Sequence, residues 1–415
     1  MAIGRKFSTN SSLTIRKLHD LFSNGMLYLR PSLDGKSRSF QRLPWWEKKR
    51  KSYLIHSIYE GTTIPPIFVY EDRQRRLCIV DGQQRLCAIF DYLDDKFKVT
   101  QAGLMEKEIE TVSEFIAGKK FSALESTDQD RIKDFELRIE TIEPPTSWEL
   151  ASPGFRAFLA AIKNEFHRLN VTSRSMSNAE MWNNTYRGII IDIAYYLQEQ
   201  MGLTHPGVTD TSVDLRLALE KYYLATTGIC TRTDILRMED VDLILQLMFL
   251  VSSGEPNHKE DGLREFLQNN ESMSGPDKVK LIEGFTENLG YIQDIFSVDE
   301  IKESEFCKKH DFYSLFSTID LLRVTGRLND TTDLVRMRNN LLEFSECVSF
   351  YGLVRNGKES AEEWSDYPIS GSVQKMVEEY FVSRTHDWNT KKCRDIRLEI
   401  LLKIATRKSP VLEIS

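Results

Sequence analysis

Residues 78–93 read CIVDGQQRLCAIFDYL, and this stretch joins three kinds of local structure. The apolar triplet Cys78–Val80 predicts a short buried strand. The residues that follow, from Asp81 to Arg85, are polar or glycine and predict a turn. Apolar residues then recur at helical spacing and predict an amphipathic helix after the turn: Leu86, Ile89, Phe90 and Leu93.

The junction between this strand and this helix has the chemistry of an anion site. The first N–H groups of a helix have no intrahelical acceptor and lie at the positive end of the helix dipole. Gly82 lets a ligand approach the backbone, and Gln83 and Gln84 add amide groups. Arg85 offers a forked donor for phosphate, and Asp81 can orient a donor or hold a metal ion. An ordinary solvated turn is the alternative interpretation, but two strongly apolar flanks favour a functional site.

The sequence DGQQR after a strand resembles the hallmark of the ParB/sulfiredoxin-like domain at the N-terminus of GmrSD-type modification-dependent restriction endonucleases. Further motifs stand in the order that this family has, over residues 10–200 of the chain. They are FQR at 40–42 followed by Trp45 and Trp46, YLIHSI at 53–58 with IPPI at 64–67, and FHRLN at 166–170 with MSNAE at 176–180.

This resemblance implies a site for a nucleoside triphosphate (NTP) and Mg²⁺. Asp81 would orient the attacking water or the metal ion, and Arg85 would stabilise charge on the transferred phosphoryl group as the second catalytic residue. The phosphates would be cradled by Gly82, Gln83 and Gln84. The implied enzyme is a Mg²⁺-dependent NTPase.

The other motifs would complete the same nucleotide pocket. Gln41 and Arg42 would bind the nucleotide beside the tryptophan pair. Arg168 would contact phosphate, and Asn170 would position a phosphate or Mg²⁺ through water. Asp81 and Asn170 are therefore the candidate metal-binding residues. In the alternative interpretation Asn170 only ends a helix and Arg168 only pairs with an acidic neighbour.

Composition predicts a soluble globular protein. The chain has 415 residues, long enough for two or three domains, with 41% hydrophobic and 28% charged residues. Its six cysteines form no CxxC pair, which is typical of reduced, buried thiols and not of disulfides or a zinc cluster. The start, MAIGRKFSTNSS, has no apolar signal-peptide region, and no apolar run is long enough to span a membrane. We therefore expect a cytoplasmic protein.

Charge is unevenly distributed along the chain, although the net charge is only −7. Residues 1–100 carry 18 Lys/Arg against 10 Asp/Glu, and residues 384–408 carry 8 against 3, whereas residues 101–383 carry 29 against 48. This pattern predicts DNA contact at the first or last segment, with solvated charges as the alternative.

Two groups of basic side chains could make such contacts. Arg73, Arg75 and Arg76 stand close in sequence to DGQQR, and we expect them to cluster around its phosphate site. A helix over 390–406 would place apolar residues inward (Ile396, Ile400, Leu401 and Ile404) and basic residues outward (Lys391, Lys392, Arg394 and Lys403).

The predicted fold class is α+β. A small ParB-like mixed α/β domain is expected at 1–156, with helices at 11–23 and 45–60, a hairpin of 67–70 and 77–80, and strands at 97–100 and 137–142. A predominantly α-helical domain is expected at 157–415, with FHRLN at the junction and the basic helix at its C-terminal end.

The predicted function is an NTP-binding and NTP-hydrolysing subunit of a modification-dependent restriction or phage-defence system. It would couple nucleotide turnover to sensing of DNA, modified or unmodified, or to control of an HNH-type nuclease partner, as a monomer or an oligomer. The chain has no clustered HNH histidines and no P-loop, and Gln83 and Gln84 stand where sulfiredoxin chemistry needs a cysteine. Two alternatives remain: a DNA-binding regulator that binds nucleotide without turnover, and a ParB-like domain that nicks DNA itself.

Overall fold

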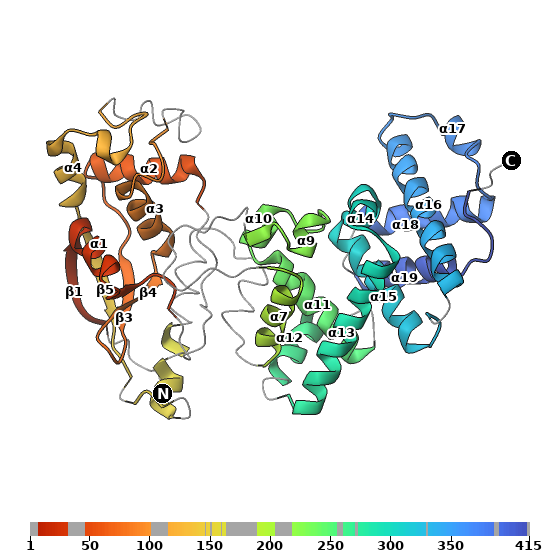
Figure 1. The fold of residues 1–415 in the computed structure, drawn as a ribbon, viewed down its shortest axis with the longest axis horizontal. Coiled ribbons are helices and arrows are strands. Elements are labelled where there is room, and N and C mark those ends of the chain that lie inside the picture. Colours follow the sequence, from red (N-terminus) through yellow and green to blue (C-terminus); the bar gives the residue numbers. More distant parts are fainter. Residues whose placement is uncertain are drawn as a thin grey trace. The chain divides into compact units, whose positions relative to one another are not determined.

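The chain forms two compact units in a computed structural model, which describes residues 7–31, 46–100, 115–145, 147–149, 152–158, 160–162, 189–203, 218–254, 260–269, 273–328, 331–385 and 390–412. The described residues of the first unit lie within Met1–Met176, and those of the second lie within Ser177–His205 and Leu215–Ser415. The first contains a β-sheet and the second is helical (Figure 1), which confirms the α+β class. The domain boundary at residue 156 stays a prediction.

A five-stranded mixed sheet organises the first unit, in the order β1-β5-β3-β4-β2. Its central hairpin is antiparallel, β5 lies parallel to β3 and antiparallel to β1, and β2 lies parallel to β4. The hairpin and the strand near 137–142 confirm two sequence predictions. The strands are β1 (Phe7–Thr14), β2 (Leu27–Tyr28), β3 (Ile67–Glu71), β4 (Leu77–Asp81) and β5 (Glu136–Ile142).

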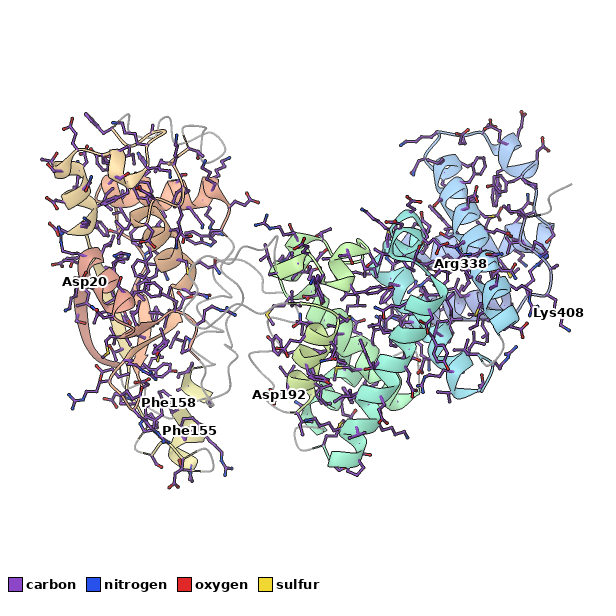
Figure 2. All side chains as sticks on the ribbon, in the orientation of Figure 1. Asp20, Phe155, Phe158, Asp192, Arg338 and Lys408 are labelled. Carbon is purple, nitrogen blue, oxygen red and sulfur yellow. The ribbon has the colours of Figure 1, made fainter. Side chains whose placement is uncertain are left out.

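Helices cover one face of this sheet, and an aromatic cluster covers the other. The helices are α1 (Ile15–Ser23), α2 (Lys48–Tyr59), α3 (Gln83–Leu93) and α4 (Ser126–Lys133), with a 3₁₀ turn η1 (Phe121–Ala123). Because side chains alternate along a strand, Ile79 packs with the helices, whereas Cys78 and Val80 pack with Phe155 and Phe158 on the other face (Figure 2). Strand β4 is therefore buried on both faces.

Two local predictions in this unit are wrong. Residues 11–14 belong to β1 and not to a helix, and Thr14 caps α1 by accepting a hydrogen bond from the backbone N–H of Lys17. The partner of β1 is β5, more than a hundred positions away, so no local pattern shows the pairing. Residues 97–100 form no strand, although Val99 exchanges backbone hydrogen bonds with Gly118 and Lys119.

The second unit confirms the predicted helical texture. No helix among its described residues, or among those of the first unit, has the length and apolar character needed to cross a membrane. The elements are α7 (Ile189–Gln200), α9 (Tyr223–Thr226), α10 (Arg232–Leu236), α11 (Glu239–Ser253), α12 (Glu260–Asn269), α13 (Gly275–Ile295), α14 (Val298–Glu303), η2 (Glu305–Cys307), α15 (Lys309–Val324), α16 (Thr331–Arg355), α17 (Ala361–Ser365), α18 (Gly371–Thr385) and α19 (Lys391–Ala405).

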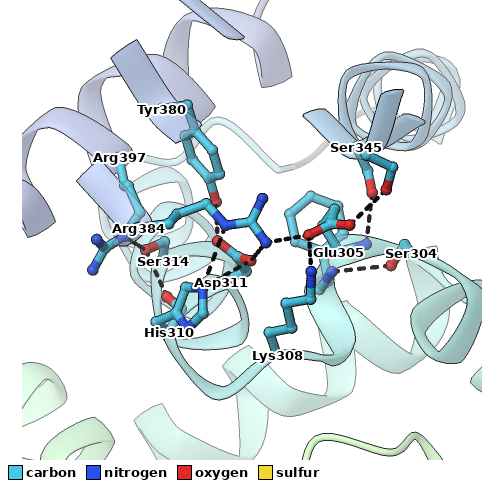
Figure 3. Close-up of polar contacts among 12 residues, drawn as sticks. Ser304, Glu305, Lys308, His310, Asp311, Ser314, Ser345, Tyr380, Arg384 and Arg397 are labelled. Carbon is cyan, nitrogen blue, oxygen red and sulfur yellow. Dashed lines mark hydrogen bonds and ion pairs between the residues drawn. The ribbon is translucent and has the colours of Figure 1, made fainter. Parts of the chain in front are cut away.

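A buried ion network ties η2, α15 and α18 together (Figure 3). Arg384 of α18 lies 3.0 Å from the Asp311 carboxylate and also pairs with Glu305. The hydroxyl of Tyr380 donates to Asp311 at 2.9 Å. Burial would raise the pKa of Glu305, but Arg384 and neighbouring donors lower it to about 2. These carboxylates depend on Arg384, because unpaired buried charges are strongly destabilising.

The C-terminal helix α19 differs from its prediction at Arg394. This side chain is only 4% exposed, lies 4.3 Å over the Tyr313 ring and donates to Gln246 Oε1 at 2.7 Å. The outward position predicted for Arg394 is wrong, because an arginine stem can be buried while its guanidinium finds polar partners. Other residues of α19 lie as predicted: Ile400, Leu401 and Ile404 are buried, and Lys391, Lys392 and Lys403 are exposed.

A second buried carboxylate, Asp240, lies at the start of α11. Its Oδ2 accepts hydrogen bonds from the Gln198 amide at 2.6 Å and from the Tyr222 hydroxyl at 2.9 Å. Burial raises the pKa of Asp240 to about 6. Its Oδ1 and the Gln198 Oε1 have no donor among the described residues. A proton on the Asp240 carboxyl group would turn one of its oxygens into a hydrogen-bond donor.

We expect Asp240→Asn to reduce the pH dependence of stability. Because the folded pKa of Asp240 is raised, its stabilising contribution is full below about pH 4 and is lost as pH rises through 6. Wild type loses this contribution as pH rises and the variant does not. The unfolding free energy of the variant minus that of wild type should therefore rise by up to about 3 kcal/mol between pH 4 and pH 7.5. Urea denaturation at several pH values measures this. Asp294→Asn, at an exposed position of α13, is the control, and identical pH profiles for Asp240→Asn and wild type would contradict the expectation.

Candidate functional site

The candidate site lies where β4 ends and α3 begins. Asp81 is the last residue of β4, Gln83 is the first of α3, and Gly82 alone makes the turn. Gly82 has φ +102°, and a Cβ atom there would overlap Cδ1 of the fully buried Ile67. Both the backbone conformation and the available space therefore require glycine. The order strand, turn and helix is confirmed, but the predicted turn over residues 81–85 is too long, because Asp81 belongs to β4 and Gln83, Gln84 and Arg85 already belong to α3.

An ion pair joins the two ends of the DGQQR motif. The Arg85 Nη2 lies 2.7 Å from the Asp81 Oδ2, and the Arg85 Nη1 donates to the carbonyl oxygen of Pro65. The side chains of Arg85 and Asp81 are 12% and 25% exposed. Burial lowers the pKa of Arg85, and the Asp81 carboxylate raises it. The guanidinium is therefore fixed at the N-terminal end of α3, with a carboxylate that an anionic ligand would have to replace.

Gln83 has a polar group that the fold does not satisfy. Its side chain is 5% exposed, and its Nε2 has no hydrogen-bond partner within the described part of the chain. A buried donor left unpaired costs about 1–3 kcal/mol. The glycine at the N-cap supplies no side-chain acceptor to the helix. An unsatisfied amide at the positive end of a helix is what a bound anion or nucleotide would satisfy.

The structure places one further cation, Arg30, at the end of the sheet that holds Asp81, and two more beside Asp91, about two turns further along α3. Arg30 follows β2 and is 7% exposed, and the parallel register of β2 and β4 brings it to the same end of the sheet as Asp81. Lys51 and Lys96 pair with the buried Asp91 of α3, at 2.6 and 3.3 Å. The only local signal for Arg30 is a charged residue directly after an apolar strand, in LYLRP.

These cations also act on the Cys87 thiol of α3. Burial raises the pKa of Cys87 to about 12, an effect that Asp91 adds to and that Lys51, Arg30 and Lys96 oppose. Cys87 is therefore a buried packing residue and not a nucleophile, which agrees with its position in the core.

Several predicted site residues lie outside the described residues. They are Gln41, Arg42, Arg168 and Asn170, so their places in a nucleotide pocket stay predictions, as does metal binding by Asn170. Within the part of the chain that the structure describes, no group of three or more His, Cys, Asp or Glu side chains could hold a metal ion. Asp81 is the one predicted metal-binding residue that is described, and it pairs with Arg85.

The arginines of the β3–β4 turn do not surround the DGQQR motif. Glu71 pairs with Leu77 at the turn, whereas Phe68 pairs with Asp81 at the opposite end of the hairpin. Arg73, Arg75 and Arg76 therefore lie one strand length from Asp81, about 13 Å away along β4. Their predicted clustering around the phosphate site is wrong, because closeness in sequence across an extended strand is not closeness in space.

Comparison with known families finds a match that covers this junction. Residues 18–187 match the family model described as GmrSD restriction endonuclease, N-terminal domain. This part of the chain is similar to a GmrSD N-terminal domain. The matched residues include β4, the DGQQR motif and α3. No curated protein sequence matches the chain.

We expect Gly82→Ala to destabilise the first unit by about 1–3 kcal/mol, because alanine is strained at positive φ and its Cβ would displace Ile67. Gly61→Ala is the matched control, since Gly61 has φ +74° and no atom lies within 4 Å of the position that its Cβ would take. Chemical denaturation of both variants separates backbone strain from the clash. Equal losses of stability would show that Ile67 imposes no constraint on Gly82.

Proposed function

We propose that the junction of β4 and α3 binds the phosphates of a nucleoside triphosphate, and that the chain hydrolyses this nucleotide with Mg²⁺. One observation carries the proposal: the first turn of α3 holds a buried arginine and an unsatisfied buried glutamine amide, and its N-cap glycine supplies no side-chain acceptor. Each of the three features favours an anion, and all three belong to the same end of one helix.

The Asp81–Arg85 pair suggests how binding and chemistry would be linked. A phosphate oxygen would take the place of the Asp81 carboxylate on Arg85, because both are bidentate acceptors for guanidinium. Asp81 would then be released to accept a hydrogen bond from the attacking water. In the alternative role, Asp81 would instead hold Mg²⁺ together with Asn170, and the ion would neutralise phosphate charge.

Turnover would be coupled to DNA sensing or to control of a nuclease subunit. The matched restriction-endonuclease domain supports this setting, and an HNH-type nuclease is the partner that the resemblance implies. The rival is a regulator that binds nucleotide without hydrolysing it. The pairing of Asp81 with Arg85 favours that rival in one respect, because a carboxylate that is bound to Arg85 is not available to orient a water.

We expect Arg85→Ala to weaken nucleotide binding by roughly 10- to 150-fold, since one charge-assisted contact contributes about 1.5–3 kcal/mol. NTP hydrolysis should be lost with it, while the fold persists because Asp81 is partly solvated. Phosphate release and nucleotide titration, each with and without DNA, measure the two effects.

Arg16→Ala is the control for this experiment, because Arg16 also pairs with carboxylates of the first unit, Asp130 and Asp134, but on an exposed surface. Normal hydrolysis by a folded Arg85→Ala protein would contradict the proposed site. Nucleotide binding by wild type without phosphate release would favour the regulator.

A further inference from the structure

The turn between β3 and β4 has an unusual concentration of arginine. We define the hairpin tip as residues 72–76, which read DRQRR. The Asp72 Oδ1 accepts hydrogen bonds from the backbone N–H groups of Gln74 and Arg76, at 2.8 and 2.9 Å. Arg75 adopts φ +58°, a left-handed conformation that is uncommon for a residue other than glycine. The backbone of the hairpin tip is therefore closely defined by its own hydrogen bonds.

The positive charge of the hairpin tip is only partly compensated. Asp72, its one carboxylate, accepts from Arg76 Nε at 2.6 Å, so these two charges are paired. Arg73 and Arg75 are both exposed and have no carboxylate partner among the described residues. Glu71 is an exposed carboxylate on the adjoining strand. The surplus charge available to a ligand thus lies on Arg73 and Arg75.

Aromatic rings support the arginines on both sides of the hairpin tip. The Arg73 guanidinium lies 5.9 Å from the centre of the Trp148 ring and donates to the Trp148 carbonyl oxygen. The Arg76 guanidinium lies 4.4 Å from the Tyr28 ring and donates to the Tyr28 hydroxyl at 2.8 Å. Trp148 itself packs against the Phe158 ring at 5.6 Å. Ordered arginines lose less conformational entropy when they bind a ligand.

We propose that the hairpin tip is a docking element for the phosphate backbone of duplex DNA. Because β3 and β4 are inner strands of the sheet, only the turn between them can meet DNA, and its arginines can contact backbone phosphates without reading bases. The tip lies at the opposite end of β4 from the DGQQR motif. DNA and nucleotide would therefore occupy different ends of the same strand.

This inference rests on the DNA-sensing half of the proposed function and not on NTP hydrolysis. Its test uses the full chain and a labelled DNA duplex, with binding measured by fluorescence anisotropy over a series of salt concentrations. The test variant combines Arg73→Gln with Arg75→Asn, because asparagine tolerates the left-handed conformation. Arg131→Gln is the matched control, since Arg131 is an exposed arginine of the same unit that lies 4.6 Å over the Tyr59 ring.

We expect the double variant to bind DNA on the order of tenfold more weakly at low salt. Its plot of log affinity against log salt should become shallower by about 1.8, at about 0.9 for each phosphate that an arginine no longer neutralises. The control should match wild type, and Arg75→Lys should retain most of the affinity because the charge remains. Thermal unfolding of each variant verifies that it is folded.

The proposal is overturned if wild type binds no DNA at low salt, or if a folded double variant keeps the wild-type affinity and salt slope. It is also overturned if the double variant loses binding to phosphatidylserine vesicles but not to DNA, because the tip would then serve a membrane surface. If wild type hydrolyses no nucleotide but the double variant loses DNA binding, the proposed NTPase fails and the hairpin tip is supported. If wild type hydrolyses nucleotide but the double variant binds DNA normally, the hairpin tip fails and the NTPase stands.

Discussion

The first unit depends on the burial of two consecutive elements that only one residue connects. Ile79 and Val80 of β4 are fully buried, and so are Leu86 and Phe90 of α3. Neither element can shift without exposing apolar surface, so the chain must turn from the strand into the helix at Gly82. Asp81 and Arg85 are therefore positioned by the core and not by their own contact. A site placed between two packed elements is held more precisely than one on a loop.

The second unit uses charge in its interior. Arg384 and Arg397 are buried among carboxylates, hydroxyls and backbone carbonyls, and Asp240 is fully buried beside Tyr222. Such groups contribute little net stability compared with apolar residues of the same volume, but they are costly to leave unpaired. They therefore restrict how η2, α15, α18 and α19 can pack, because an alternative arrangement would leave a buried charge without its partner.

The sequence was sufficient where a pattern is local. The apolar triplet, the polar turn and the helical spacing within Cys78–Leu93 predicted the strand, the turn and the helix, and the helical character of the second unit was also predicted. It was insufficient where the partner is distant. The pairing of β1 with β5, the return of Arg30 to the end of β4, and the burial of Arg394 against Gln246 are all set by contacts between remote segments. Arg75 and Asp81 are close in sequence, but the extended strand β4 lies between them and keeps them far apart in space.

The burial of cysteines has a practical consequence for spectroscopic work on this protein. Burial raises the pKa of Cys78, Cys87 and Cys347 to about 12 and that of Cys230 well above its ordinary value. Thiolate is the form that reacts with maleimides, so these four are protected in the native chain. Cys307 and Cys393, which are half-buried in the helical unit, remain to be replaced. A fluorophore or spin label attached through a new cysteine would then report on a single chosen position.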